Sequence, residues 1–340
     1  MDIKTVLEEL CSVTGVSGDE FSASEKSAEM LRKYTDDVCV DAFGNVLGFL
    51  KSPDSNAKTV MLDAHIDSVG LIVTYIEDNG FLRVGACGSP DLRTIMAQSV
   101  TVHGKKSVPG VVATLPPHVK KDSGVPDVGD ISIDVGLSRE EVEKIISLGD
   151  RVTVNSQFTL LNADIVSAAA IDDRSGVCAV LYAIEILKDK QLPYNLAVCF
   201  SAQEETGERG VKQAAFRVKP DEAIVVDVSF GNTPDGNTRN TAEIGSGAMI
   251  GFSACLDKDM SNRLRDIAVS ENIPFTCEIM PSSTGTNADA IAVSGEGVKC
   301  CTVSFPIRYM HTAVECVKIS DIVAASELIC AYIIGGGTDV

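Results

Sequence analysis

Unbroken apolar runs alternate with helical patterns through the second half of the chain. The runs at 195–203, 222–230 and 300–311 lack polar alternation, which is typical of buried strands. Patterns with helical spacing occupy 174–189, 209–218 and 261–272. Buried strands separated by helices predict an α/β fold in which helices cover a mainly parallel, mixed sheet.

The N-terminal part begins similarly but then changes character. A hairpin is predicted at 38–51 and a strand ending in polar residues at 58–73. From 70 to 161, short strands rich in glycine and proline replace the helical pattern, and one helix interrupts them at 138–149. We therefore expect a small β-rich domain at 70–161, inserted into a larger domain formed by 1–69 and 162–340.

Two predicted helices begin with the spacing of a capping box, in which a serine and a glutamate three residues later satisfy backbone N–H groups. The pairs are Ser17 with Glu20 and Ser138 with Glu141. We expect a helix to begin at each pair.

Composition narrows the class of protein. The formal net charge of −19 argues against a nucleic-acid partner, which would need a basic face. The sequence contains no apolar stretch of 18 or more residues, so we expect no membrane span. The N-terminus lacks the pattern of a secretory signal. Eleven cysteines without a CxxC motif indicate free thiols in a reducing compartment. We expect a cytoplasmic protein without a membrane partner.

Histidines and acids gather where predicted strands end or helices begin. The chain has four histidines, and His65 and His311 both follow strand-like runs. The acids at comparable places are Asp172-Asp173, Glu204-Glu205 and Asp227. Helix capping explains single acids, but like charges converging at one sheet edge repel unless a cation lies among them.

Imidazoles and carboxylates together suit Zn²⁺, and also Co²⁺ or Mn²⁺. Five such side chains exceed the usual requirement of one catalytic zinc ion. They suit two ions about 3.5–4 Å apart that share one carboxylate. Asp67, two residues after His65, is placed to orient that imidazole.

Several motifs together resemble one enzyme family. They are DAHIDSVG, AAAIDDRSG, SAQEETGERG, VVDVS and PIRYMHTAVE, with GVSGDE near the N-terminus, PDLRTIMAQ and LPPHV in the insert, and GTNADAIAVSGEGV before the last histidine. In order and spacing, nearly end to end, the chain resembles the cobalt- or zinc-dependent aminopeptidases of metallopeptidase family forty-two, which often form tetrahedral dodecamers.

The resemblance implies two divalent ions in each subunit. His65 and Asp227 would hold one ion, Glu205 and His311 the other, and Asp172 would bridge them, with a cis peptide bond to Asp173. Zinc is the expected metal, with cobalt or manganese as alternatives.

The resemblance also implies the chemistry. Glu204 would act as general base on a metal-activated water, and Asp67 would orient His65. The reaction would remove N-terminal residues from short peptides. The insert, β-barrel-like in this family, would form contacts in a homo-oligomer, either a dimer or a dodecamer built from dimers. His118, in the insert, is expected to be structural, although its family position can approach a neighbouring subunit's site.

Some positions depart from the family pattern as well. They are Ala169, where relatives often have a basic residue, TAVE after His311, where a proline is common, and GTNAD in place of GTDA. None of these changes removes a proposed ligand, so we expect them to affect substrate fit or loop geometry.

Three alternatives remain open at this stage. A deacylase or carboxypeptidase would use the same two-metal chemistry on a related fold. A glycoside hydrolase needs two carboxyls flanking a sugar bond, but the chain has no tryptophan for sugar stacking. A non-catalytic relative would keep the fold and the metal ligands without turnover.

Overall fold

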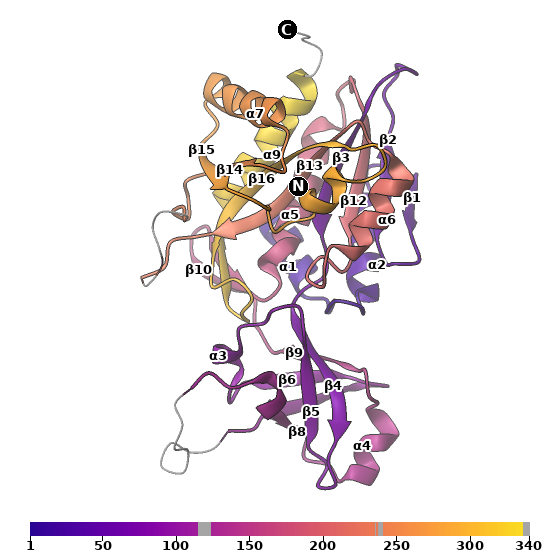
Figure 1. The fold of residues 1–340 in the computed structure, drawn as a ribbon, viewed down its shortest axis with the longest axis vertical. Helices are drawn as coiled ribbons and strands as arrows, with labels where there is room; N and C mark the ends of the chain where they lie inside the picture. Colours follow the sequence, from indigo (N-terminus) through magenta and orange to yellow (C-terminus); the bar gives the residue numbers. More distant parts are fainter. Residues whose placement is uncertain (115–123, 235, 237–240, 336–340) are drawn as a thin grey trace.

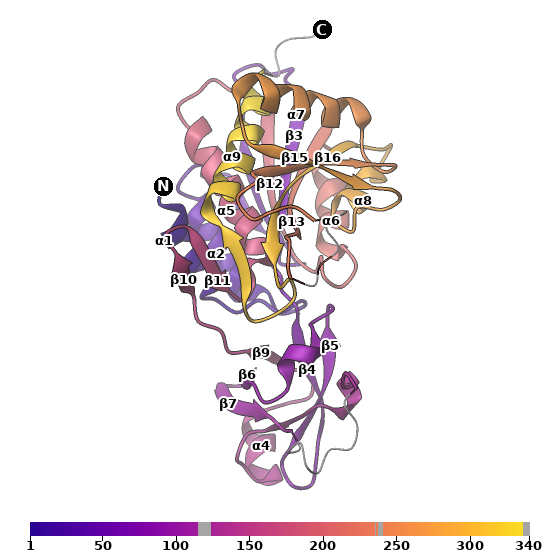
Figure 2. The same cartoon turned by 90° about the vertical axis from the view of Figure 1, so that its left-hand side faces the viewer.

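The computed structural model describes residues 1–114, 124–234, 236 and 241–335. His118 and the LPPHV motif lie outside the described residues, so the prediction for that histidine is not tested. Figures 1 and 2 show a large α/β body and a smaller β-barrel at one end of it.

The helices of the α/β body are α1 (Ile3–Cys11), α2 (Phe21–Leu31), α5 (Ile171–Leu187), α6 (Arg209–Val218), α7 (Lys258–Glu271), α8 (Ala288–Ala292) and α9 (Ile319–Ile334). Its strands are β1 (Val38–Val40), β2 (Val46–Leu50), β3 (Thr59–His65), β10 (Thr159–Asn162), β11 (Ile165–Ala168), β12 (Asn195–Ser201), β13 (Glu222–Phe230), β14 (Ala248–Ser253), β15 (Phe275–Met280), β16 (Lys299–Arg308) and β17 (Glu315–Lys318).

These strands form one mixed sheet in the order β1-β2-β12-β3-β13-β16-β17-β11-β10, and β14 joins β15 to β16. The four central strands, β12, β3, β13 and β16, are parallel, whereas the strands toward both ends of this order pair antiparallel. The mixed sheet with a parallel centre confirms the predicted fold class.

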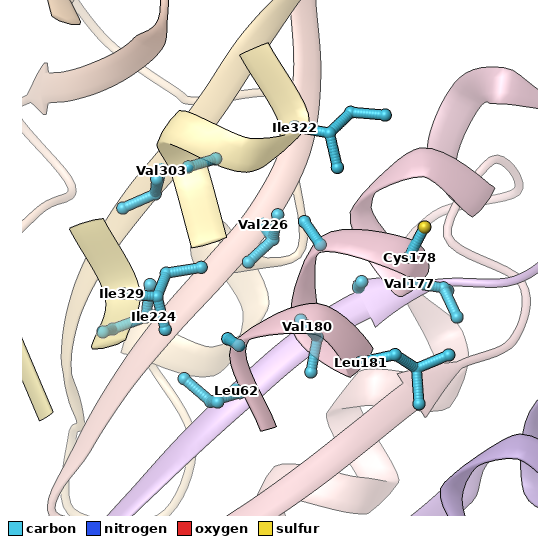
Figure 3. Packing of buried hydrophobic residues seen from close by; sticks show 14 of the residues in the cluster. Leu62, Val177, Cys178, Val180, Leu181, Ile224, Val226, Val303, Ile322 and Ile329 are labelled. Atoms are coloured by element: carbon cyan, nitrogen blue, oxygen red, sulfur yellow. The ribbon is translucent and has the colours of Figure 1, made fainter. Parts of the chain in front are cut away.

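Both faces of the sheet are covered. Helices α1, α2, α5, α7 and α9 share one apolar core with it, and α6 and α8 share a second core on the opposite face. Figure 3 shows α5 and α9 packing over strands β3, β13 and β16, with Leu62, Val226 and Val303 pointing toward the helices. Because successive residues of a strand face opposite sides, a strand buried on both faces has no polar alternation, as the sequence pattern indicates.

The inserted region folds into a closed barrel of six strands in the order β4-β5-β8-β7-β6-β9. The strands are β4 (Gly70–Ile76), β5 (Leu82–Cys87), β6 (Ser99–His103), β7 (Ser107–Val112), β8 (Ser132–Asp134) and β9 (Arg151–Val154), accompanied by α3 (Leu92–Ile95), α4 (Arg139–Ile145) and a 3-10 turn at Val128–Asp130. The barrel has its own apolar core. The domain boundaries at 69/70 and 161/162 stay predictions.

Two local predictions were wrong, and one was confirmed. The apolar run at 58–73 forms two strands instead of one, because the chain leaves the sheet after His65 and enters the barrel at Gly70. Ser17 does not cap a helix: α2 begins at Phe21, and the Ser17 hydroxyl bonds elsewhere. The capping box of Ser138 and Glu141 is present at α4.

All eleven cysteines lie in the described part of the chain and are free thiols. In the described ranges, no helix combines the length and the apolar character that crossing a membrane requires.

Candidate metal centre

The parallel centre of the sheet brings the predicted site residues to one edge. His65 is the last residue of β3 and pairs in register with Ser201, the last residue of β12. Glu204 and Glu205 follow β12 directly, and Asp227 lies late in β13. Because the carboxyl ends of parallel strands meet at the same edge, strand order alone places these side chains together.

Asp172 occupies the centre of the cluster. Its Oδ1 lies 3.1 Å from Nε2 of His65, and its Oδ2 lies 3.4 Å from Nε2 of His311. Asp172 opens α5 with non-helical backbone angles, and its peptide bond to Asp173 is cis, as the family resemblance implies. One carboxylate therefore faces both imidazoles.

The remaining predicted side chains surround this central group. Nε2 of His65 lies 3.9 Å from a carboxylate oxygen of Glu204 and equally far from one of Asp227. Nε2 of His311 lies 3.3 Å from Oε1 of Glu205. The structure thus gathers all the predicted ligands and the predicted base, although their roles stay predictions.

Potential ligand atoms also converge in two triads. One contains His65, Asp172 and Glu205, and the other contains His65, Asp173 and Asp227. Asp173 is not a predicted ligand. Its carboxylate already accepts N–H groups of His65 and Gly176, so we regard Asp173 as a residue that holds the backbone.

Asp67 lies beneath the cluster, fully buried. Its carboxylate accepts the backbone N–H groups of Glu204 at 3.0 Å and Glu205 at 3.2 Å, and its Oδ1 lies 3.4 Å from Nδ1 of His65. Ser17 donates its hydroxyl to the same carboxylate at 2.6 Å. Sequence reasoning missed this role of Ser17, because its spacing from Glu20 also fits a capping box.

A buried arginine ties the N-terminal segment to the site. Arg174 donates to the carbonyl oxygens of Ile66, Leu10 and Val13. A β-carbon at Gly15 would lie 2.5 Å from the Arg174 guanidinium, which explains the glycine there. The only signal for this arginine in the sequence was its position directly after two candidate acids.

Burial and mutual repulsion make the acids hard to ionise. Burial, opposed by His65 and reinforced by neighbouring acids, raises the pKa of Glu204 to about 9 and that of Asp227 to about 8. Asp172 is the exception: although burial opposes this shift, His311 and His65 hold its pKa below the usual range. Burial alone would lower the pKa of His65, but hydrogen bonds with Asp172 and Asp67 raise it well above its ordinary value.

Divalent cations fit this donor set. Imidazole nitrogens and carboxylate oxygens are borderline ligands that suit zinc, cobalt or manganese. Oε1 of Glu205 is buried and makes no hydrogen bond within the described residues, despite its closeness to His311. A cation would provide the missing partner for this oxygen and offset the repulsion among the acids.

A cavity of about 520 Å³ opens beside the cluster. Asp172, Glu205 and His311 line it on one side. Residues of the barrel strands β6 and β9 and the N-terminal segment 11–15 line the other parts. The cavity therefore lies between the two bodies of the molecule and reaches the candidate centre.

Comparisons with known proteins identify the family of the chain. Residues 44–328 match the family described as M42 glutamyl aminopeptidase. The lysyl aminopeptidase of Pyrococcus furiosus is 31% identical over 325 residues, covering 93% of this chain and 92% of that protein.

Solved structures match over nearly the whole chain. An aminopeptidase from the archaeon Desulfurococcus kamchatkensis superposes with a TM-score of 0.92 at 32% identity, covering 97% of this chain and 94% of that one. The TET1 peptidase of Pyrococcus horikoshii, which can assemble into a tetrahedron or a large octahedral shell, gives a TM-score of 0.86 at 29% identity, covering 98% and 99%. The chain is a peptide-bond hydrolase and belongs to the M42 glutamyl aminopeptidase family.

Proposed function

We propose that this protein is an aminopeptidase that uses two divalent metal ions and a glutamate base to remove N-terminal residues from short peptides. The observation that carries this proposal is the position of Asp172, whose two oxygens face His65 and His311. A carboxylate with one oxygen near each of two imidazoles is placed to be shared by two ions.

His65 and Asp227 would hold one ion, Glu205 and His311 the other, and Asp172 both. When bound, the ions lower the pKa of a coordinated water and polarise the scissile carbonyl. Zinc is the expected metal, and the same ligands admit cobalt or manganese.

Glu204 is the proposed general base. Its backbone is held by Asp67, and its carboxylate lies beside His65 without a hydrogen bond to that ring. It would take a proton from the attacking water and deliver it to the leaving amine.

Replacement of Glu204 by glutamine tests this assignment. Glu204→Gln keeps the shape of the side chain and removes the base, so kcat should fall by about 10²–10⁴-fold. Metal analysis should still find about two ions per chain. Glu208→Gln, a glutamate of the same loop, is the matched control and should keep normal activity. Normal turnover by Glu204→Gln would show that another group is the base.

The alternatives differ in substrate. A deacylase would cleave only N-acetylated peptides in a panel that also contains free-amine peptides. EDTA should silence a two-metal peptidase acting on either class of substrate.

We also propose that the protein is a homo-oligomer, either a dimer or a dodecamer built from dimers. The support is the likeness to the TET1 peptidase, together with exposed leucines on the edge strand β10, where Leu161 is 59% exposed. An unpaired edge with apolar side chains favours association. Light scattering after size-exclusion chromatography would separate a dodecamer, a dimer and a monomer by mass.

A further inference from the structure

Glu315 is a buried acid for which the reaction itself requires no role. It is the first residue of β17, and its side chain is only 2% exposed. One oxygen accepts the backbone N–H of Asp172 at 3.1 Å, and the other accepts the backbone N–H of His311 at 2.7 Å. The two candidate ligands, which are remote in the sequence, are thus joined through one carboxylate.

The sheet explains how this contact arises. Strand β17 lies between β11 and β16 in the strand order. Strand β11 leads into Asp172, and β16 leads into His311, so the residue at the start of β17 lies between the two segments as they leave the sheet. The backbone of Glu315 is itself held in register opposite Ala168.

The backbone at His311 needs such support. His311 has a φ of +63°, in the left-handed region that residues other than glycine rarely adopt. Such a conformation persists where neighbouring contacts determine it. Glu315 supplies one of these contacts, and the carbonyl oxygen of Ser89 supplies another through Nδ1 of the ring.

We propose that Glu315 is a positioning residue that sets the separation of Asp172 and His311 for metal binding, an inference that rests on the proposed two-metal function. Each of its oxygens already accepts a backbone N–H group, and among the described residues Glu315 belongs to neither triad of potential ligand atoms. A carboxylate is required because it offers two acceptors, whereas an amide offers one acceptor and one donor.

The substitution Glu315→Gln tests this role, because it preserves size and disrupts one of the two contacts. Asp321→Asn is the matched control: Asp321 is also a buried carboxylate that accepts two backbone N–H groups, those of Gly245 and Gly247, but it is not part of the cluster. Both variants lose a comparable structural contact, and only Glu315→Gln should affect metal binding.

The measurement is calorimetric titration of each metal-free protein with Zn²⁺. The wild type and Asp321→Asn should bind two ions alike. In Glu315→Gln, at least one binding step should weaken by about 10–100-fold. A titration like that of the wild type, or equal weakening in Asp321→Asn, would overturn the inference.

Two further results keep the test decisive. If Glu315→Gln fails to fold, Glu315→Asp keeps the charge but is one methylene too short to reach both N–H groups, and it should weaken the same step. A wild-type protein that binds fewer than two ions contradicts the proposed function and not the role of Glu315, so the two failures are distinguishable.

Discussion

The barrel and the α/β body bury different kinds of side chain. Among the described residues, every buried polar or charged side chain lies outside 70–161, and the barrel core is wholly apolar. The α/β body buries several acids near the candidate metal centre, including Asp63, Asp67, Asp173 and Glu315. Apolar burial stabilises a fold without help, whereas buried like charges destabilise it until a partner is bound.

The difference shows that the two parts depend on different conditions for their stability. The barrel should be stable with or without metal, because nothing in its core needs a counter-charge. The α/β body should depend on metal near its site, since the raised pKa values of Glu204 and Asp227 reflect unfavourable ionisation.

The largest expected effect is the loss of stability when a substitution creates a cavity in the barrel core. Leu82 is completely buried there, and Leu82→Ala should lower the free energy of unfolding of the barrel by about 2–5 kcal/mol. Zinc content of the folded protein should not change. Leu148→Ala, at an exposed leucine of the same domain, should change stability by less than about 0.5 kcal/mol. Denaturant titration gives the free energy of unfolding, and metal analysis gives the zinc content. Loss of zinc from the folded Leu82→Ala protein would contradict the view that the barrel and the metal site are stabilised independently.

A smaller effect is expected when zinc is added to the metal-free protein. At free zinc about 100 times the dissociation constant, binding should stabilise the site by about 2.7 kcal/mol and slow local amide exchange about 100-fold. This protection should appear at the start of α5 and in the segment after β12, and not in the barrel strands β6 and β7. Hydrogen-exchange mass spectrometry resolves these segments. Equal protection in the barrel would mean that both bodies unfold as one cooperative unit.

The parts of the site that sequence predicted are those fixed by strand order. Unalternating runs indicate covered parallel strands, and parallel strands place their following residues at one edge, so His65, Glu204 and Asp227 could be predicted to meet. Glu315 could not be assigned a role in this way, because its carboxylate accepts the backbone N–H of Asp172, which is remote in the sequence. Ser17 was misassigned, because a local spacing fits both a cap and a tertiary contact.

The inserted domain shows the same limit. Glycine, proline and short runs predicted a β-rich insert, but the closure of six strands into a barrel depends on pairings such as β4 with β9, which are remote in sequence. The run at 58–73 was predicted as one strand, since its apolar pattern continues across the turn between β3 and β4. Periodicity therefore identified the type of structure but not the point at which the chain changes domains.

The smallest expected effect is on substrate selectivity, and it depends on the cavity between the barrel and the α/β body. Apart from the acids of the cluster and Glu315, the described lining contains no lysine, arginine, aspartate or glutamate, and the barrel contributes uncharged residues such as Thr101, Val152 and Thr153. Because bound metal ions would neutralise the acids of the cluster and backbone N–H groups already engage Glu315, a charged substrate side chain would lose water there without gaining a counter-charge. We therefore expect leucyl-anilide to exceed both glutamyl- and lysyl-anilide in kcat/KM by about tenfold, equivalent to about 1.4 kcal/mol.

The same cavity offers a direct way to sharpen that expectation. Thr101→Lys would place a cation on the barrel wall at a residue that is not a proposed ligand, and should raise the ratio of glutamyl to leucyl turnover several-fold. Thr101→Gln, similar in length but neutral, should leave the ratio as in the wild type. Initial rates on the three anilides measure this ratio. A wild-type preference for glutamyl-anilide would mean that a cation outside the described lining contacts the substrate, and the uncharged barrel wall would then not determine selectivity.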